Sequence, residues 1–390
     1  MIQFAENRCK IQQGVSFEGF TYPETALVRK VQQMVPSYAP TSLVSLKSFA
    51  ERLGVRAVLL KDESSRFGLN AFKGLGGIYA MFRVICRELG LDPEITTIEM
   101  LQEPPYIERI RQMVFATTTD GNHGKGVSFA AGVFGCKAFV FMPAGTVKVR
   151  ARAIRDAGNA EVSITGMHYD ECVAWTAQQA RQNGWHLIQD TSWSGYEEIP
   201  GWIMQGYTTM YYEALQQMRE MGYDVPTHLF LQAGVGSMAG AVAAAASVSL
   251  PELPVIATVE SSEAACFYDS FRVSDGSPRA AHGSEKTIMA GLNCSVPCTL
   301  AWEILKKCAA GGFACKDFVT CEGMRLLASD PQKIVSGESG AVTAGLLKVL
   351  LTEPKYESIC RNLKFNRNSV VLLFSTEGDT DPENYRRIIG

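Results

Sequence analysis

The chain has 390 residues, of which 46% are hydrophobic and 20% are charged, and its formal net charge is −3. This length corresponds to two domains, or to one large α/β domain with an insertion. The small net charge argues against nucleic-acid or anionic-membrane binding, and the apolar content argues against long disorder. No apolar run of about 18 residues occurs, so we expect no transmembrane helix and no membrane partner.

The cysteines and histidines favour a cytoplasmic protein without a metal site. The chain has 11 cysteines without C-x-x-C spacing, and residues 1–14 lack the charged-then-apolar pattern of a signal peptide. We therefore expect free thiols in a reducing compartment. Only 5 histidines occur, and neither H-E-x-x-H nor a Cys/His cluster with zinc spacing is present, so no metal is expected.

The first part of the chain shows a mixed pattern. Apolar spacing predicts a helix over 41–53 that ends at Gly54, a strand over 55–60 and a helix over 73–89. The proline-containing stretch 90–105 is interpreted as a surface segment.

Strands and helices then alternate regularly. Predicted strands lie at 113–116, 138–142, 161–164 and 185–188, and predicted helices end at 134 or span 147–157 and 169–182. This alternation predicts a parallel sheet. The remaining predicted elements are a helix over 201–221, strands over 228–232 and 255–259, an Ala-rich helix over 237–248 and a buried strand over 370–374.

A glycine loop, A-G-V-G-S-M-A-G at 233–240, follows a predicted strand and begins a helix. Gly234 and Gly236 allow a tight turn, and the N–H groups at a helix N-terminus bind anions, so we predict a phosphate site. The loop also fits the G-x-G-x-x-A dinucleotide fingerprint, with Glu260 placed where the ribose-binding acid belongs. Taken alone, it favours a nicotinamide or flavin enzyme. The structural alternative is a loop that only closes a tight turn.

Lys73 stands in N-A-F-K-G-L-G-G, between the apolar Phe72 and a glycine-rich helix start. Desolvation lowers the pKa of a lysine and makes it available as a nucleophile or base. The alternative is an ordinary surface lysine.

The segment K-D-E-S-S-R-F-G-L-N-A-F-K-G resembles the cofactor-lysine segment of the fold-type II pyridoxal-phosphate enzymes, the tryptophan synthase β-like family. Four more segments follow in the order of that family: T-T-D-G-N-H-G at 118–124, the glycine loop, G-E-S-G-A at 337–341 and S-T-E-G-D-T-D at 375–381. The resemblance covers roughly residues 35–381.

The resemblance implies an α/β fold with two open parallel-sheet domains and pyridoxal 5'-phosphate in the cleft between them. It implies a large cofactor-binding domain, 1–83 plus 199–390, with a small α/β domain, 84–198, inserted in it. It also implies a homodimer that acts on a small amino acid.

The resemblance also implies roles for single residues. Lys73 forms the cofactor imine beside Phe72, Asn122 lies near the ring hydroxyl, and Ser375 faces the ring nitrogen. The turn that holds the substrate carboxylate contains Thr119, Gly121 and His123. The phosphate is held by Gly234, Val235, Gly236, Ser237 and Met238.

Within the family, two features resemble the diaminopropionate ammonia-lyases. Asp120 stands where the related dehydratases have a small neutral residue, and the segment 189–207, Q-D-T-S-W-S-G-Y-E-E-I-P-G-W-I-M-Q-G-Y, supplies Asp190. The resemblance implies α,β-elimination of both enantiomers of 2,3-diaminopropionate to pyruvate and two ammonia. Asp120 is then the base for the D-substrate and Asp190 the base for the L-substrate. The structural alternative for each aspartate is a helix or turn cap.

Other functions stay open. A serine/threonine dehydratase of the same family is the first alternative, and a nicotinamide-dependent oxidoreductase using the glycine loop is the second. A third is a non-enzymatic amino-acid-binding regulator, against which the intact Lys73, Asn122 and Ser375 argue. A disulfide between Cys266 and Cys294 is a further hypothesis, because each follows an element expected to face the cofactor.

Overall fold

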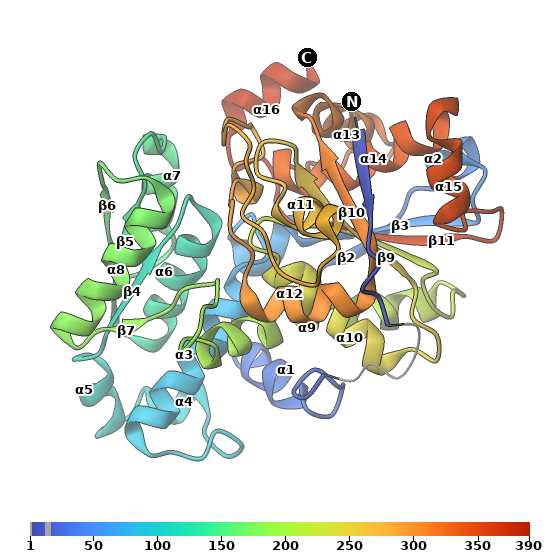
Figure 1. Cartoon of the computed structure of the whole chain (residues 1–390). Coiled ribbons are helices and arrows are strands. Elements are labelled where there is room, and N and C mark those ends of the chain that lie inside the picture. Colours follow the sequence, from blue (N-terminus) through green and yellow to red (C-terminus); the bar gives the residue numbers. More distant parts are fainter. Residues whose placement is uncertain (1, 12–16) are drawn as a thin grey trace. The chain divides into compact units, whose positions relative to one another are not determined.

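The computed structural model describes residues 2–11 and 17–390. Residues 1 and 12–16 lie outside the described residues, and so does that part of the segment 1–14 for which no signal peptide is expected. The chain divides into two compact units (Figure 1). Unit 1 consists of Met1–Tyr22, Pro40–Ser65 and Met210–Gly390, and unit 2 of Pro23–Ala39 and Arg66–Thr209. Within the described ranges, no helix has the length and apolar character needed to cross a membrane.

Unit 1 is built on a sheet that has seven strands within the described residues, in the order β1-β10-β9-β8-β11-β3-β2. The inner strands run parallel to one another, and the edge strands β1 and β2 are antiparallel to their neighbours. The strands are β1 (Ile2–Glu6), β2 (Ser42–Ser45), β3 (Ala57–Asp62), β8 (His228–Gln232), β9 (Val255–Ser261), β10 (Ala309–Cys315) and β11 (Val370–Ser375).

Both faces of this sheet are covered by helices. On one face, Phe230, Val259 and Leu373 join a hydrophobic core with helices α13 (Asp317–Ser329) and α14 (Glu338–Thr352). Because side chains alternate along a strand, the buried neighbour Leu231 points to the other face, where α10 (Ser237–Ser249) packs on β8. Burial on both faces explains why these strands read as continuous apolar runs.

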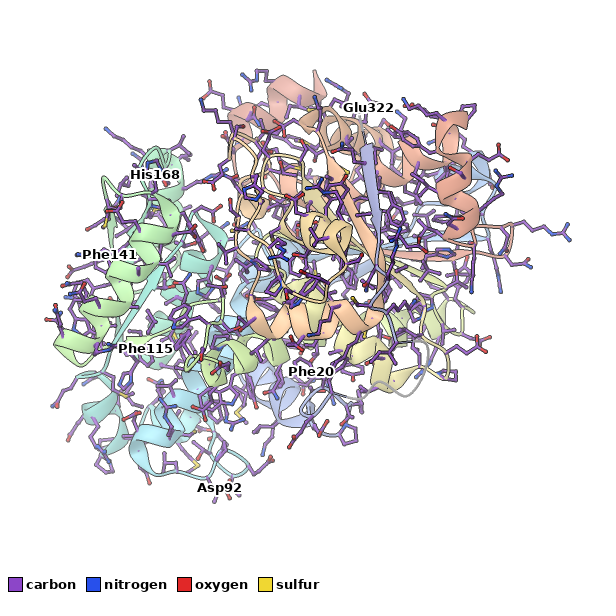
Figure 2. The ribbon with its side chains drawn as sticks, in the orientation of Figure 1. Phe20, Asp92, Phe115, Phe141, His168 and Glu322 are labelled. Carbon is purple, nitrogen blue, oxygen red and sulfur yellow. The ribbon has the colours of Figure 1, made fainter. Side chains whose placement is uncertain are left out.

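Unit 2 contains a parallel four-stranded sheet in the described residues, with the order β6-β5-β4-β7. The predicted parallel sheet is therefore confirmed. On neighbouring strands, Phe115 is fully buried and Phe141 packs edge-on against Trp175 at 4.9 Å between ring centroids (Figure 2). The elements are β4 (Val114–Thr118), α6 (Asn122–Phe134), β5 (Lys137–Met142), α7 (Lys148–Ala157), β6 (Ala160–Ile164), α8 (Tyr169–Asn183) and β7 (His186–Leu187).

The predicted helix over 41–53 is wrong in its first half. Residues Ser42–Ser45 form β2, which pairs antiparallel with β3, and only α2 (Lys47–Leu53) is helical. The sequence scan also missed β10, whose glycines lower strand propensity. A Cβ at Gly311 would lie 2.2 Å from the carbonyl oxygen of Ala5, so the pairing of β10 with β1 requires a glycine there.

The division into units differs from the predicted boundaries at 83/84 and 198/199, which stay a prediction. Helices α3 (Gly74–Leu89) and α6 approach each other closely: a Cβ at Gly77 would lie 2.7 Å from the carbonyl oxygen of Gly126. A Cβ at Gly126 would likewise lie 2.7 Å from the carbonyl oxygen of Lys73. This backbone contact explains why the start of α3, with Lys73, belongs to unit 2.

The other helices connect these layers. They are α1 (Ala26–Gln33), α4 (Ile98–Leu101), α5 (Tyr106–Ile110), α9 (Glu198–Glu220), α11 (Cys266–Val273), α12 (Thr299–Cys308), α15 (Glu357–Asn362) and α16 (Pro382–Ile389), with short 3-10 turns at Glu63–Gly68, Ala290–Leu292 and Pro354–Tyr356.

Candidate active site

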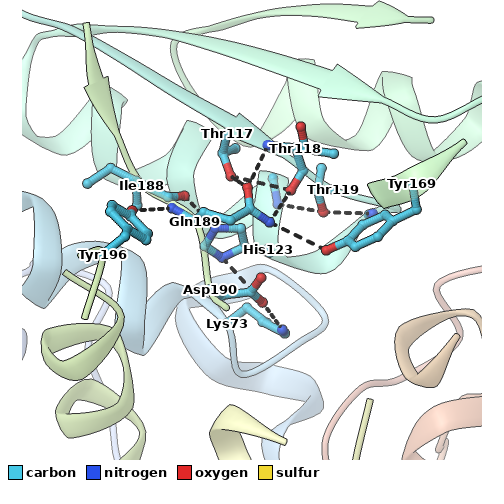
Figure 3. Close-up of polar contacts among 12 residues, drawn as sticks. Lys73, Thr117, Thr118, Thr119, His123, Tyr169, Ile188, Gln189, Asp190 and Tyr196 are labelled. Atoms are coloured by element: carbon cyan, nitrogen blue, oxygen red, sulfur yellow. Dashed lines mark hydrogen bonds and ion pairs between the residues drawn. The ribbon is translucent and has the colours of Figure 1, made fainter. Parts of the chain in front are cut away.

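Lys73 and Asp190, two of the predicted catalytic residues, meet directly in unit 2. Lys73 immediately precedes α3, and its Nζ donates a hydrogen bond to Oδ2 of Asp190 within an ion pair (Figure 3). Asp190 is almost fully buried, whereas the side chain of Lys73 keeps 19% of its exposure. The lysine ammonium also lies 5.7 Å from the ring centroid of Phe72. A partly accessible amine therefore shares a desolvated site with a carboxylate.

The backbone that carries Asp190 is held by the amide of Gln189. Its Oε1 accepts the N–H of Thr118 at 2.9 Å, and its Nε2 donates to the carbonyl oxygen of Thr118 at 3.1 Å (Figure 3). The N–H of Gln189 donates to the hydroxyl of Tyr196 at 2.9 Å, and that hydroxyl donates to the carbonyl oxygen of Leu187 at 2.9 Å. The segment after β7 is thus tied to the end of β4, which fixes the position of Asp190.

His123 lies in the first turn of α6 and is buried against the same segment. Its Nε2 lies 2.8 Å from the carbonyl oxygen of Ile188, and its Nδ1 lies 3.8 Å from Oδ2 of Asp190 (Figure 3). Because a carbonyl only accepts, Nε2 carries the proton. Burial lowers the pKa of His123 more than the Asp190 carboxylate raises it. Burial raises the pKa of Asp190, but His123 and Lys73 lower it further, so this pKa lies below its usual value.

The turn between β4 and α6 contains the other predicted residues of this region. Oγ1 of Thr119 accepts the N–H groups of Gly121 at 3.0 Å and of Gly124 at 3.1 Å, and the N–H of Thr119 donates to Phe141 at 3.1 Å. Asp120 and Asn122 are half-buried beside it. Two of the N–H groups expected to face the substrate carboxylate thus already have acceptors, which narrows that expectation to the rest of the turn.

The glycine loop of unit 1 has the geometry of an anion cradle. Gly236 has φ +90°, in the left-handed region, and a Cβ there would lie 2.3 Å from the ring of Phe267. The loop leads directly into α10, whose first N–H groups have no acceptor within the helix. Gly234 is also tightly enclosed, because its Cβ would lie 2.9 Å from the carbonyl oxygen of Gly291. The backbone can therefore approach a bound phosphate closely.

Glu260 does not serve as a ribose-binding acid. Its two carboxylate oxygens accept the N–H groups of Phe267 at 2.8 Å and Tyr268 at 2.7 Å, in the first turn of α11. The carboxyl is fully buried, and burial raises its pKa to about 8. The acidic residue that gave the dinucleotide fingerprint its second element is thus a helix cap.

Two further predictions fall in unit 1. Ser375 is buried at the end of β11, and its Oγ donates to Oγ of Ser336 at 2.8 Å. Across the described residues, all cysteines are free thiols, so the disulfide considered between Cys266 and Cys294 is absent from this structure.

Tyr207 on α9 is the site residue that the sequence analysis missed. It is fully buried, and its hydroxyl has no hydrogen-bond partner within the described part of the chain. Its ring lies 4.7 Å from that of Phe72, next to Lys73. Buried hydroxyls normally have partners, so this one fits a site completed by a bound polar group. The available signal was its place at the end of the segment 189–207.

Comparisons with known proteins agree on one group. The family model described as "Pyridoxal-phosphate dependent enzyme" matches residues 35–360. A diaminopropionate ammonia-lyase of Escherichia coli is 44% identical over 393 residues, covering 100% of this chain and 96% of the relative.

Solved structures of the Escherichia coli diaminopropionate ammonia-lyase are also similar. The complex with D-serine has a TM-score of 0.92 at 43% identity and covers 100% of this chain and 97% of that chain. The complex with an aminoacrylate-PLP azomethine reaction intermediate has a TM-score of 0.89 at 43% identity, with the same coverage of both chains.

Proposed function

This chain belongs to the pyridoxal-phosphate dependent enzymes, and we propose that it is a carbon–nitrogen lyase that converts D- and L-2,3-diaminopropionate into pyruvate and two ammonia. The observation that carries this proposal is the ion pair between Lys73 and Asp190. It joins the lysine expected to bind the cofactor to a carboxylate that this family's dehydratases are not expected to need. The identity over the full chain to diaminopropionate ammonia-lyases supports the same substrate.

The residues present fit pyridoxal 5'-phosphate. Lys73 is a partly exposed amine beside an apolar ring, and Tyr207 offers a buried hydroxyl that lacks a partner in the described residues. The cradle formed by Gly234, Val235, Gly236, Ser237 and Met238 suits the phosphate. We propose that Lys73 attaches the cofactor, with Phe72 beside it, that Asn122 meets the ring hydroxyl, and that Ser375 meets the ring nitrogen.

When bound, pyridoxal phosphate withdraws electrons from the substrate and so stabilises negative charge at the α-carbon. The hydroxyl of Ser375 is neutral and does not hold a proton on the ring nitrogen as a carboxylate would. This moderates charge withdrawal and favours elimination over transamination.

The protein side chains handle the protons and the charges of the substrate. Diaminopropionate carries one ammonium more than serine, and the carboxylates of Asp120 and Asp190 suit that extra charge. The two α-protons of the enantiomers point in opposite directions. We propose that Asp120 removes the proton of the D-substrate and Asp190 that of the L-substrate, while the turn with Thr119, Gly121 and His123 holds the substrate carboxylate.

The alternatives have weaker support. A serine/threonine dehydratase has no second ammonium to neutralise and so no use for two aspartates. A nicotinamide enzyme needs an acid for the ribose, and Glu260 is engaged with α11.

Purified protein loaded with pyridoxal phosphate tests the proposal. We expect kcat/KM for D- and L-diaminopropionate to exceed that for L-serine and L-threonine by at least about tenfold, a difference of about 1.4 kcal/mol in transition-state binding. Equal or faster turnover of serine or threonine supports the dehydratase instead. Bound nicotinamide, without a visible band from bound pyridoxal phosphate, supports the oxidoreductase.

We also propose a cytoplasmic homodimer. The free thiols of the described cysteines support a reducing compartment. Dimerisation rests on the family resemblance, and light scattering of the purified protein tests it.

A further inference from the structure

The imidazole of His123 bridges two residues of one segment. Its protonated Nε2 binds the carbonyl oxygen of Ile188, and its Nδ1 faces the carboxylate of Asp190 two residues later. The ring is 97% removed from solvent, since its exposed fraction is 3%. Nδ1 has no hydrogen-bond partner within the described residues, although it is buried. A buried, unprotonated nitrogen that faces a carboxylate has no structural benefit, because two lone pairs meet there.

We propose that His123 acts through Asp190, as a positioning residue that accepts the proton which Asp190 removes from L-diaminopropionate. This inference rests on the proposed function. In the first step the α-carbon–hydrogen bond breaks, its electron pair stays on the carbon, and the proton binds Oδ2 of Asp190. In the second step this proton moves from Oδ2 to Nδ1 of His123, which leaves a carboxylate beside an imidazolium.

The proton then returns by the same route. Nδ1 gives it back to Oδ2, and Oδ2 gives it to the departing β-amine, which leaves as ammonia. The imidazole and the carboxylate end in their starting states, so no outside proton source is needed. The rotation of the ring is fixed throughout, because Nε2 keeps its hydrogen bond to Ile188.

The surroundings are suited to this exchange. Asp190 also accepts a hydrogen bond from Lys73, so its carboxylate is a weak base that readily passes a proton on. His123 is neutral at rest because burial lowers its pKa, and a neutral Nδ1 is free to accept a proton.

Two substitutions separate proton acceptance from positioning. In His123→Gln, the side-chain amide keeps a donor near the place of Nε2 but has no basic nitrogen at the place of Nδ1. In His123→Asn, the amide takes the place of Nδ1 and orients Asp190 without accepting a proton. We expect both variants to lower kcat for L-diaminopropionate by about 10²-fold, as for loss of a proton-transfer group, and to change kcat for the D-enantiomer by less than about threefold.

The ratio of the two rates is the decisive quantity. Both enantiomers are assayed on one preparation, so incomplete folding lowers both rates equally and cancels. His186→Gln is the matched control, because His186 lies on β7 and stacks on Phe115 instead of Asp190. Asp190→Asn gives the reference effect.

Each outcome decides the question. A selective loss on the L-substrate in the His123 variants and in Asp190→Asn supports the inference. Selective loss in Asp190→Asn together with unchanged or equally lowered rates in the His123 variants overturns the inference alone. Absence of L-selectivity in Asp190→Asn overturns the assignment of Asp190 and the inference with it.

Discussion

Lys73 differs from the other buried lysines in what its ammonium contacts. Nζ of Lys61 contacts Glu213 at 2.7 Å and Gln217 at 2.9 Å, and Nζ of Lys125 donates to the carbonyl oxygen of Leu69 at 3.0 Å. Those contacts hold helices and loops together. Only Lys73 is paired with an aspartate of the segment 189–207 that resembles the ammonia-lyases.

Lys73→Ala is therefore expected to lose the covalent attachment of the cofactor and nearly all turnover. Borohydride reduction of the loaded protein followed by peptide mapping is expected to find the cofactor on Lys73. Lys137→Ala is the control, because Lys137 pairs with Glu161 at the surface. Recovery of the label on Lys61 or Lys125 contradicts the assignment.

The two aspartates are expected to differ in stereochemistry. Losing a positioned base costs about 10²–10⁴-fold in rate. Asp120→Asn should suppress turnover of the D-enantiomer far more than that of the L-enantiomer, and Asp190→Asn should do the reverse. Steady-state rates on both enantiomers check this, with the exposed Asp156→Asn on α7 as control. If each variant loses both enantiomers equally, the aspartates bind the second ammonium and do not act as face-specific bases.

At the scale of elements, the glycine loop before α10 is expected to be essential for retaining the cofactor. Gly236→Asp adds a side chain that meets the ring of Phe267 and a negative charge that repels phosphate. We expect this variant to lose pyridoxal phosphate on dialysis. Gly222→Asp is the matched control, because Gly222 also has a left-handed φ of +82° but nothing lies within 4 Å of its Cβ. Equal retention by both variants contradicts a phosphate site at this loop.

The junction of β9 and α11 is expected to depend on Glu260. Glu260→Gln leaves one oxygen for two N–H groups, so the N–H of Phe267 or Tyr268 faces another donor. We expect a loss of about 1–3 kcal/mol in the free energy of unfolding, as for a buried group left unsatisfied. Denaturant unfolding measures this, and an unchanged midpoint refutes the capping role.

Elements with a clear period were predictable, and those shaped by contacts distant in sequence were not. The strands β4 and β5 and the helices after them follow local apolar patterns, and the structure confirms them. The strand β2 was mistaken for helix because Leu43 and Leu46 also fit helical spacing, and only pairing with β3 decides between the two. The strand β10 was missed because its glycines are explained by contact with β1.

The candidate site shows the same limit. The ordered motifs indicated Lys73, Asp190 and the glycine loop, because each lies in a locally distinctive segment. Gln189 and Tyr196 act through hydrogen bonds to the ends of β4 and β7, so no local pattern marked them. Tyr207 and the second nitrogen of His123 became visible only as buried polar atoms without partners in the described residues.

At the scale of the whole molecule, the residues proposed for one reaction are divided between the two units. Lys73, Asp120 and Asp190 belong to unit 2, and the glycine loop and Ser375 belong to unit 1. The family match spans residues of both units, and the similarity to diaminopropionate ammonia-lyases covers the entire chain. The proposed activity is thus a property of the full chain, and it is best tested on the full chain.

The most direct test measures the products formed from diaminopropionate. Full-length protein loaded with pyridoxal phosphate is incubated separately with the D- and the L-enantiomer, and pyruvate and ammonia are both quantified. The account predicts two ammonia for each pyruvate from either enantiomer, with no pyruvate from Lys73→Ala. No pyruvate from either enantiomer, or release of ammonia without pyruvate, would contradict it.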